Sequence, residues 1–219
     1  MSLNVGTNSI GSIYIGSQNA NYIAISEVYY GSTLVYSSGY PSGTVLFEKG
    51  TAGTYTLTVK KNCTVSLILV GGGGGGSYSN SYGSWTNTQN GGSGGMVTGN
   101  CSLTKGNYTI VVGAAGTGLY SVNGGGGAGG TAGSGGQSTA FGNTAGGGGG
   151  AYTWTGYFDS RGSAGGAGSA SAISGCTASN GAAGSTSNRY GNYGGGGPGG
   201  GGSAANNNGK VGYCKVTVV

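Results

Sequence analysis

Aromatic residues are the side chains of this sequence best suited to binding chemistry, and nine of the 21 lie in three short inserts at 77–90, 151–161 and 185–193. Each insert lies between glycine runs. Rigid aromatic anchors mixed with Ser, Gly and Asn are typical of protein binding surfaces, and aromatic faces beside amides and hydroxyls also suit sugars. The pattern therefore predicts a binding surface. Its residues are Tyr78, Tyr82, Trp85, Tyr152, Trp154, Tyr157, Phe158, Arg161, Arg189, Tyr190 and Tyr193. A second interpretation stays open, in which these rings cover the glycine-rich part as a minimal core.

Catalytic chemistry has little support in the sequence. Histidine is absent and the acids are only Glu27, Glu48 and Asp159, so a His-containing triad or metal site is excluded. Paired-carboxylate chemistry needs two acids at one site, and these three are widely spread. No phosphate-binding GxxxxGK[ST] motif is present. We expect no enzyme activity, no cofactor and no metal.

The four cysteines are Cys63, Cys101, Cys176 and Cys214, and none forms a CxxC pair, which argues against zinc. Cys63 and Cys214 alternate with polar residues as buried strand residues do. Buried thiols and disulfides both remain open, because sequence alone does not assign disulfide pairing.

Charge and the length of the apolar runs argue against two classes of partner, nucleic acid and the membrane interior. Lysines and arginines number 8, the net charge is +5, and no basic patch could neutralise several phosphates, so we expect no nucleic acid. No run approaches the roughly 18 apolar residues of a membrane-spanning helix, so no membrane insertion is expected. The first residues also lack the features of a secretory signal.

Period-two alternation predicts an all-β fold. Apolar residues alternate over 44–49, 55–60, 63–70, 96–104 and 108–112, and no stretch has helical spacing. The same alternation returns at 211–219, after a long region with almost no core-forming residues. We therefore predict a small β-sandwich from 44–70, 96–112 and 211–219, with the intervening chain inserted as an excursion.

Glycine supplies 58 of the 219 residues, and its runs lie at 71–76, 124–127, 146–150 and 194–197. A chain without Cβ atoms can form threefold extended helices that approach closely enough to bond side by side. The sequence thus predicts a bundle of polyglycine-II-type helices over 71–95 and 113–210. The competing interpretation is flexible glycine coil.

Residues 1–40 carry a weak repeat, in which Ile13-Tyr-Ile-Gly-Ser returns as Val28-Tyr-Tyr-Gly-Ser. Short alternating runs that end in Gly-Ser are typical of strands and turns. We predict a β-rich attachment or oligomerisation module at 1–40 and a glycine-rich domain at 44–219.

The order of motifs from Tyr55 to Val59, Val65 to Gly76, Gly106 to Gly113 and Gly136 to Gly142 resembles the glycine-rich domains of bacteriophage tail-fibre and minor structural proteins. The repeat at 1–40 is similar to modules that precede such domains. Glycine-rich adhesins at phage fibre tips bind host receptors through variable distal loops. The resemblance implies a virion protein, made in the host cytoplasm and extracellular after lysis.

The resemblance also implies partners. These are other virion proteins through residues 1–40, further copies of the chain in a homo-oligomer (a trimer is favoured), and a host cell-surface glycan or protein. Two alternatives remain: a purely architectural decoration or filament subunit without a receptor site, and an ice-binding protein. The bulky insert at 151–161 argues against a flat ice-binding face.

Overall fold

The computed structural model describes residues 3–5, 8–10, 27–30, 33–37, 39–81, 85–123, 127–155, 160–163, 165–183 and 208–219. In these residues the protein is all-β, with several sheets and no helix. The chain divides into two compact units, Met1–Pro41 and Ser42–Val219.

The first unit contains two strand pairs. β1 (Leu3–Val5) pairs antiparallel with β2 (Asn8–Ile10). β3 (Glu27–Tyr30) pairs antiparallel with β4 (Thr33–Ser37), with a register shift between Val28 and Tyr29.

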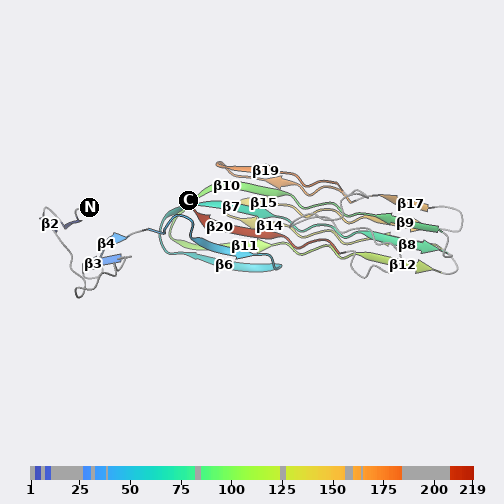
Figure 1. Cartoon of the computed structure of the whole chain (residues 1–219), viewed down its shortest axis with the longest axis horizontal. Helices are drawn as coiled ribbons and strands as arrows, with labels where there is room; N and C mark the ends of the chain where they lie inside the picture. Colours follow the sequence, from blue (N-terminus) through green and yellow to red (C-terminus); the bar gives the residue numbers. More distant parts are fainter. Residues whose placement is uncertain are drawn as a thin grey trace. The chain divides into compact units, whose positions relative to one another are not determined.

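The second unit begins with two five-stranded sheets, which we call the sheet end (Figure 1). The first has the order β19-β10-β7-β20-β5. Its strands are β5 (Val45–Lys49), β7 (Cys63–Val70), β10 (Met96–Leu103), β19 (Cys176–Ser179) and β20 (Tyr213–Val218). The second has the order β18-β15-β14-β11-β6. Its strands are β6 (Gly53–Val59), β11 (Gly106–Val112), β14 (Ser138–Ala140), β15 (Asn143–Ala145) and β18 (Ala170–Ser171).

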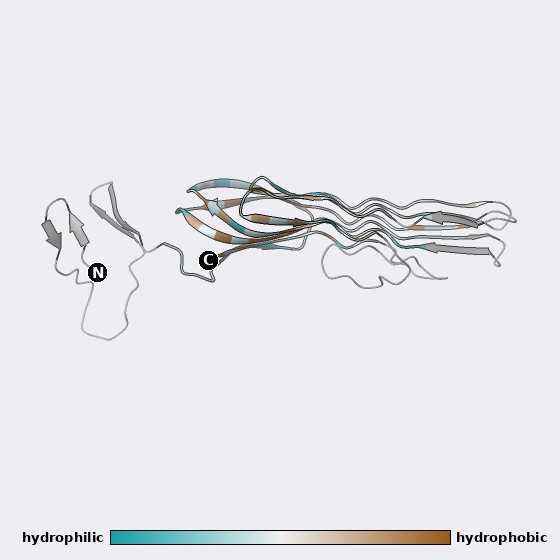
Figure 2. Cartoon of the chain, turned by 90° about the horizontal axis from the view of Figure 1, so that it is seen from above, coloured by the Kyte–Doolittle hydropathy of each residue, from teal (hydrophilic) through white to brown (hydrophobic). Residues whose placement is uncertain are grey.

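A side-chain core fills the sheet end. The alternating residues of β7 and β20 are buried, as the period-two pattern predicts, and so are those of β6, β10 and β11. The largest fully buried side chains include Val59, Val65, Leu67, Leu69, Val97, Ile110, Val112 and Val216. In Figure 2 the hydrophobic stretches gather in these strands.

The predicted return of the last strand to a sheet formed by the early strands is confirmed. β20 lies between β7 and β5 and pairs antiparallel with both, for example Val216 with Leu67. The chain between β11 and β20 also supplies β14, β15, β18 and β19, which sequence reasoning did not assign. These strands have at most four residues and consist of Ser, Thr, Ala, Asn and one Cys, so hydrophobic alternation could not reveal them.

Glycine-rich stretches leave the sheet end and return to it, and we call them the glycine segments. Neither helix nor strand is assigned within them. They comprise residues 71–76, 90–95, 113–118, 132–137, 146–151, 165–169, 181–183 and 208–212. Backbone hydrogen bonds join each segment to its neighbours, as predicted for the packing of the runs at 71–76 and 146–150. The run at 194–197 lies outside the described residues.

These lateral bonds follow a period of three. The N–H groups of Gly71 and Gly74 donate to the segment 90–95, and those of Gly72 and Gly75 donate to 132–137. Gly73 donates to Lys210. The carbonyls of the same central segment accept from 113–119 and 146–151. Among the described residues, segment 71–76 therefore bonds to five others.

Close backbone approach explains why these positions are glycine. A Cβ added at Gly148 would lie well under 3.0 Å from backbone atoms of Gly92 and Ser93, and one at Gly135 would meet Gly72 and Gly73 in the same way. Real Cβ atoms do not approach backbone that closely. The segments thus pack at a separation that only a chain without side chains permits.

Two three-stranded sheets lie at the far end of the glycine segments from the sheet end (Figure 1), and we call them the distal sheets. One has the order β12-β8-β9, from Leu119–Asn123, Ser77–Ser81 and Trp85–Gln89. The other has the order β13-β16-β17, from Ala128–Thr131, Tyr152–Thr155 and Ser160–Ser163. β8 lies against β13 and β16, so the two sheets pack together.

Candidate functional site

The distal sheets hold the described part of the predicted binding surface. Tyr78 lies in β8, Trp85 in β9, Tyr152 and Trp154 in β16, and Arg161 in β17. The described strands of inserts 77–90 and 151–161 are thus brought together at one end of the second unit. Tyr82, Tyr157, Phe158, Arg189, Tyr190 and Tyr193 lie outside the described residues.

Tyr78 packs within the distal end. Its side chain is only 4% exposed, and its ring stacks on Tyr120 of the neighbouring strand, with centroids 5.1 Å apart and an interplanar angle of 8°. The register pairs these two residues directly, because β12 runs parallel to β8. Tyr120 itself is 54% exposed. Tyr78 therefore supports a ring that faces solvent.

β16 presents its aromatic side chains outward. Along this strand Tyr152 is exposed and Trp154 half-buried, while Thr153 and Thr155 between them are buried, so the two rings share the outer face. A Cβ at Gly127 would lie about 3.0 Å from the Trp154 ring. The chain that enters β13 thus passes directly beside this ring.

Small polar side chains fill the interior between the distal sheets. Ser77, Ser79, Thr153 and Thr155 are all fully buried. Thr155 Oγ1 donates to the carbonyl of Ala128 at 3.3 Å, whereas the hydroxyls of Ser77, Ser79 and Thr153 make no hydrogen bond in the described structure. Among the aromatic side chains whose burial is described here, Tyr78 is buried, Trp154 is half-buried, and Tyr120 and Tyr152 are exposed.

Strand β12 is also part of this surface, although the sequence analysis did not include it. Val122 is 55% exposed and lies on the same face of the strand as Tyr120. Sequence reasoning placed 113–210 in the glycine bundle, with one run at 124–127. Residues 124–126 lie outside the described residues, and directly after the run the structure pairs β13 with β16 in register, for example Gly129 with Trp154. The alternation of Leu119, Tyr120, Ser121 and Val122 was the available signal.

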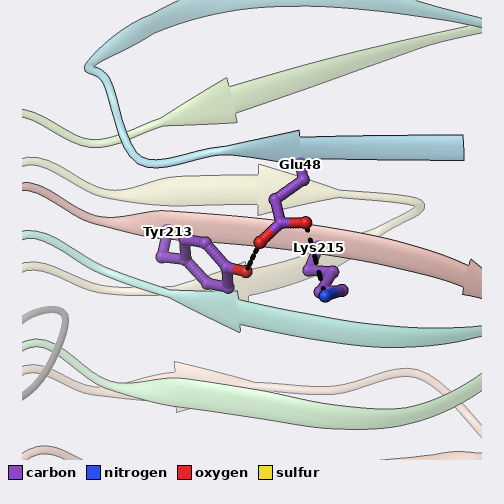
Figure 3. Close-up of polar contacts among 3 residues, drawn as sticks. All are labelled: Glu48, Tyr213 and Lys215. Atoms are coloured by element: carbon purple, nitrogen blue, oxygen red, sulfur yellow. Dashed lines mark hydrogen bonds and ion pairs between the residues drawn. The ribbon is translucent and has the colours of Figure 1, made fainter. Parts of the chain in front are cut away.

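The described distal surface also differs in charge from the sheet end. Arg161 is the one charged residue in the described strands of the distal sheets, whereas lysines and Glu48 lie on the sheet end. There Glu48 accepts a hydrogen bond from Tyr213 at 2.5 Å and pairs with Lys215 at 3.3 Å (Figure 3). The Tyr213 hydrogen bond, followed by Lys215, lowers the pKa of Glu48 below its ordinary value. The distal surface is by contrast aromatic and nearly uncharged.

The sequence of most of the chain matches a known protein family. The sequence profile of the glycine-rich domain family matches residues 50–218. The chain belongs to this family. None of the curated proteins matches the chain. The matched range of the glycine-rich domain begins before β6 and runs through every glycine segment and both distal sheets to β20.

The described residues were also searched for a metal site, a membrane-spanning helix and a pocket. No group of three or more His, Cys, Asp or Glu that could hold a metal ion occurs there. No helix in the described ranges is long and apolar enough to cross a membrane. An open hollow of about 360 Å³ lies at the sheet end. It is lined by Asn62, Cys63, Thr64, Ser102, Leu103 and Thr104, none of which belongs to the distal sheets.

Proposed function

We propose that this protein is a bacteriophage virion component, a tail fibre or fibre tip, that binds a host-surface receptor through its distal sheets. The observation that supports this most is the exposure of Tyr120, Val122 and Tyr152 on sheets whose described strands carry one charged residue, Arg161. Aromatic side chains that face solvent on a rigid sheet suit both sugar rings and protein hot spots.

The proposal includes a structural role for the glycine segments as polyglycine-II-type helices. Their lateral bonds support it, because residues three apart bond to the same neighbour, which is the symmetry of a threefold extended chain. Such a bundle holds the distal sheets away from the sheet end. The unit Met1–Pro41 then serves attachment to other virion proteins or to further copies, a trimer being favoured.

A purely architectural role is the second candidate, and one observation favours it. β12 is an edge strand of its sheet and carries exposed Tyr120 and Val122. Unpaired strand edges with apolar side chains are also the surfaces by which subunits associate. In that case the same side chains are contacts between copies.

The test is cell binding by a Val122→Ala, Tyr152→Ala double variant. Fluorescently labelled purified protein is titrated onto a panel of bacterial strains, Gram-positive species included, and bound label is counted per cell. We expect the double variant to lose roughly tenfold or more in apparent affinity, because a central anchor contributes about 2 kcal/mol. Its melting temperature should change little, since both side chains face solvent.

The matched control is Val45→Ala, because Val45 is a comparably exposed valine (47%) at the sheet end. It should bind as the original protein does. Unchanged cell binding by the double variant, on strains that bind the original protein, would contradict the receptor role. Loss of a defined oligomer by the double variant, measured by sedimentation, would instead support the architectural role.

A further inference from the structure

Two of the four cysteines lie together at the edge of the first sheet. Cys101 in β10 and Cys176 in β19 place their Sγ atoms 3.3 Å apart. Both are free thiols in this structure. A disulfide has a sulfur–sulfur bond of about 2.05 Å, so the two sulfurs need to approach by only about 1.3 Å. That distance is within reach of side-chain rotation.

Glycine creates this close approach. Gly99 pairs in register with Cys176, and a Cβ at Gly99 would lie 2.5 Å from the Cys176 Cα. Gly99 and Gly175 have φ values of 150° and 87°, which side-chain-bearing residues rarely adopt. The Asn100 N–H donates to the Gly175 carbonyl at 3.0 Å. β19 is therefore held against β10 at the point where the sulfurs meet.

The two thiols differ in access to solvent. Cys101 is 3% exposed, and its burial, followed by the neighbouring Cys176, raises its pKa. The Asn143 side-chain amide donates to Cys101 Sγ at 3.8 Å and opposes that shift. Cys176 is only half-buried, and its thiol lies near the Asn100 carbonyl, with a sulfur–oxygen distance of 3.9 Å. An oxidant can therefore reach Cys176 first, with Cys101 placed to resolve the product.

We propose that Cys101 and Cys176 form an intramolecular disulfide when the protein meets a low-molecular-weight disulfide of the glutathione class. The Cys176 thiolate attacks one sulfur of the small disulfide, which releases one small thiol and leaves a mixed disulfide. The Cys101 thiol then loses its proton as its sulfur attacks Cys176 Sγ, and the second small thiolate leaves and takes up a proton. Two protein thiols lose two electrons and two protons, and the small disulfide gains both as two thiols.

The cross-link would fasten the edge strand of the first sheet. β19 is the end strand of its sheet and pairs only with β10 among the described strands. The chain from Cys101 to Cys176 includes the glycine segments 113–118, 132–137, 146–151 and 165–169. A bond between its ends closes this excursion covalently, which restricts the unfolded chain and stabilises the fold.

The experiment compares reduced protein with protein incubated with oxidised glutathione, using thiol titration, non-reducing peptide mapping and thermal unfolding. We expect titratable thiols to fall from four to two and one peptide pair, containing Cys101 and Cys176, to be joined. The melting temperature should rise by roughly 10 °C, given the length of chain that the bond encloses.

Cys176→Ser is the test variant, and Cys63→Ser is its matched control, since Cys63 is also a half-buried thiol of the same sheet. The rise on oxidation should vanish in Cys176→Ser and persist in Cys63→Ser. Four titratable thiols after incubation, or a joined pair that includes Cys63 or Cys214, would overturn the proposal. A lasting mixed disulfide on Cys176 without the Cys101 bond would overturn it as well.

Discussion

The sheet end and the glycine segments are parts of one domain, yet different atoms hold them together. At the sheet end, side chains such as Leu67, Val97 and Val216 fill the space between sheets. In the glycine segments the backbone forms both the contacts and the bonds, for example Gly148 N–H to the Gly72 carbonyl at 2.9 Å. A core of side chains tolerates exchange of similar residues. Where backbone approaches as closely as it does around Gly148, an added Cβ would clash, so the sequence constraint at such positions is stricter even though the composition is simpler.

The largest expected effect on stability comes from adding one methyl group to a closely packed glycine. Gly148→Ala should reduce the free energy of unfolding by about 3 kcal/mol, because the new Cβ would overlap backbone atoms of Gly92. Chemical denaturation of purified protein measures the loss.

Gly166→Ala is its matched control. This glycine lies in the neighbouring segment 165–169 and accepts a bond from Gly149, but a Cβ there would meet nothing within 4 Å. It should unfold like the original protein. Equal stability of the two variants would mean that the segments are more loosely packed than their bonds indicate.

A smaller effect compares a buried hydroxyl at the sheet end, that of Ser138, with one in the distal sheets, that of Ser79. Ser138 accepts a bond from the Gly113 N–H at 2.9 Å and donates to the Val70 carbonyl at 2.7 Å, where the sheets meet the glycine segments. Ser138→Ala should cost about 2 kcal/mol, since two buried backbone groups lose their partner.

Ser79→Ala provides the comparison in the distal sheets. The Ser79 hydroxyl is buried without a hydrogen bond in the described structure, so its removal should leave stability unchanged or slightly higher. Denaturation midpoints of the two variants give the answer. A clear loss in Ser79→Ala would indicate that this hydroxyl is bonded in solution, for instance through water.

The smallest expected effect concerns pH at the sheet end. Because Tyr213 and Lys215 lower the pKa of Glu48, this carboxylate contributes stability above its ordinary pKa of 4.5 and loses it as pH falls through the lower folded value. The melting temperature of the original protein should therefore drop more steeply than that of Glu48→Gln between about pH 5 and pH 3. The difference should be small, because Glu48 is exposed. If the melting temperatures of the two proteins fall in parallel with pH, the Glu48 carboxylate does not contribute to stability in acid.

Sequence patterns predicted those parts of the fold that alternating side chains determine. Cys214, Val216 and Val218 indicated a final core strand, and β20 occupies that place. The pattern could not indicate β19, because Cys176, Thr177, Ala178 and Ser179 carry no hydrophobic alternation. Its position depends instead on glycine at 99 and 175, which is visible only once the strands are paired.

The residues of the distal sheets could be predicted only in part, because some of them are brought there by strand pairing that the sequence does not show. The density of aromatic residues located Tyr78, Tyr152 and Trp154, which the structure brings to the same pair of distal sheets. Residues Tyr120 and Val122 belong there because β12 pairs in parallel with β8. Parallel pairing joins strands far apart in sequence, and no local pattern shows which strand a given segment will meet.

The period of three in the lateral bonds limits how the length of this domain can change. Because residues three apart bond to the same neighbour, inserting one or two residues in a segment would turn all later donors toward the wrong chain. Inserting three restores every donor to its own neighbour and, for the proposed polyglycine-II-type helix with its rise of ~3.1 Å per residue, adds about 9 Å. The segments surround one another, so all of them must lengthen together. Longer and shorter versions of this domain should therefore differ by whole triplets in every segment at once, while the strands at both ends stay the same.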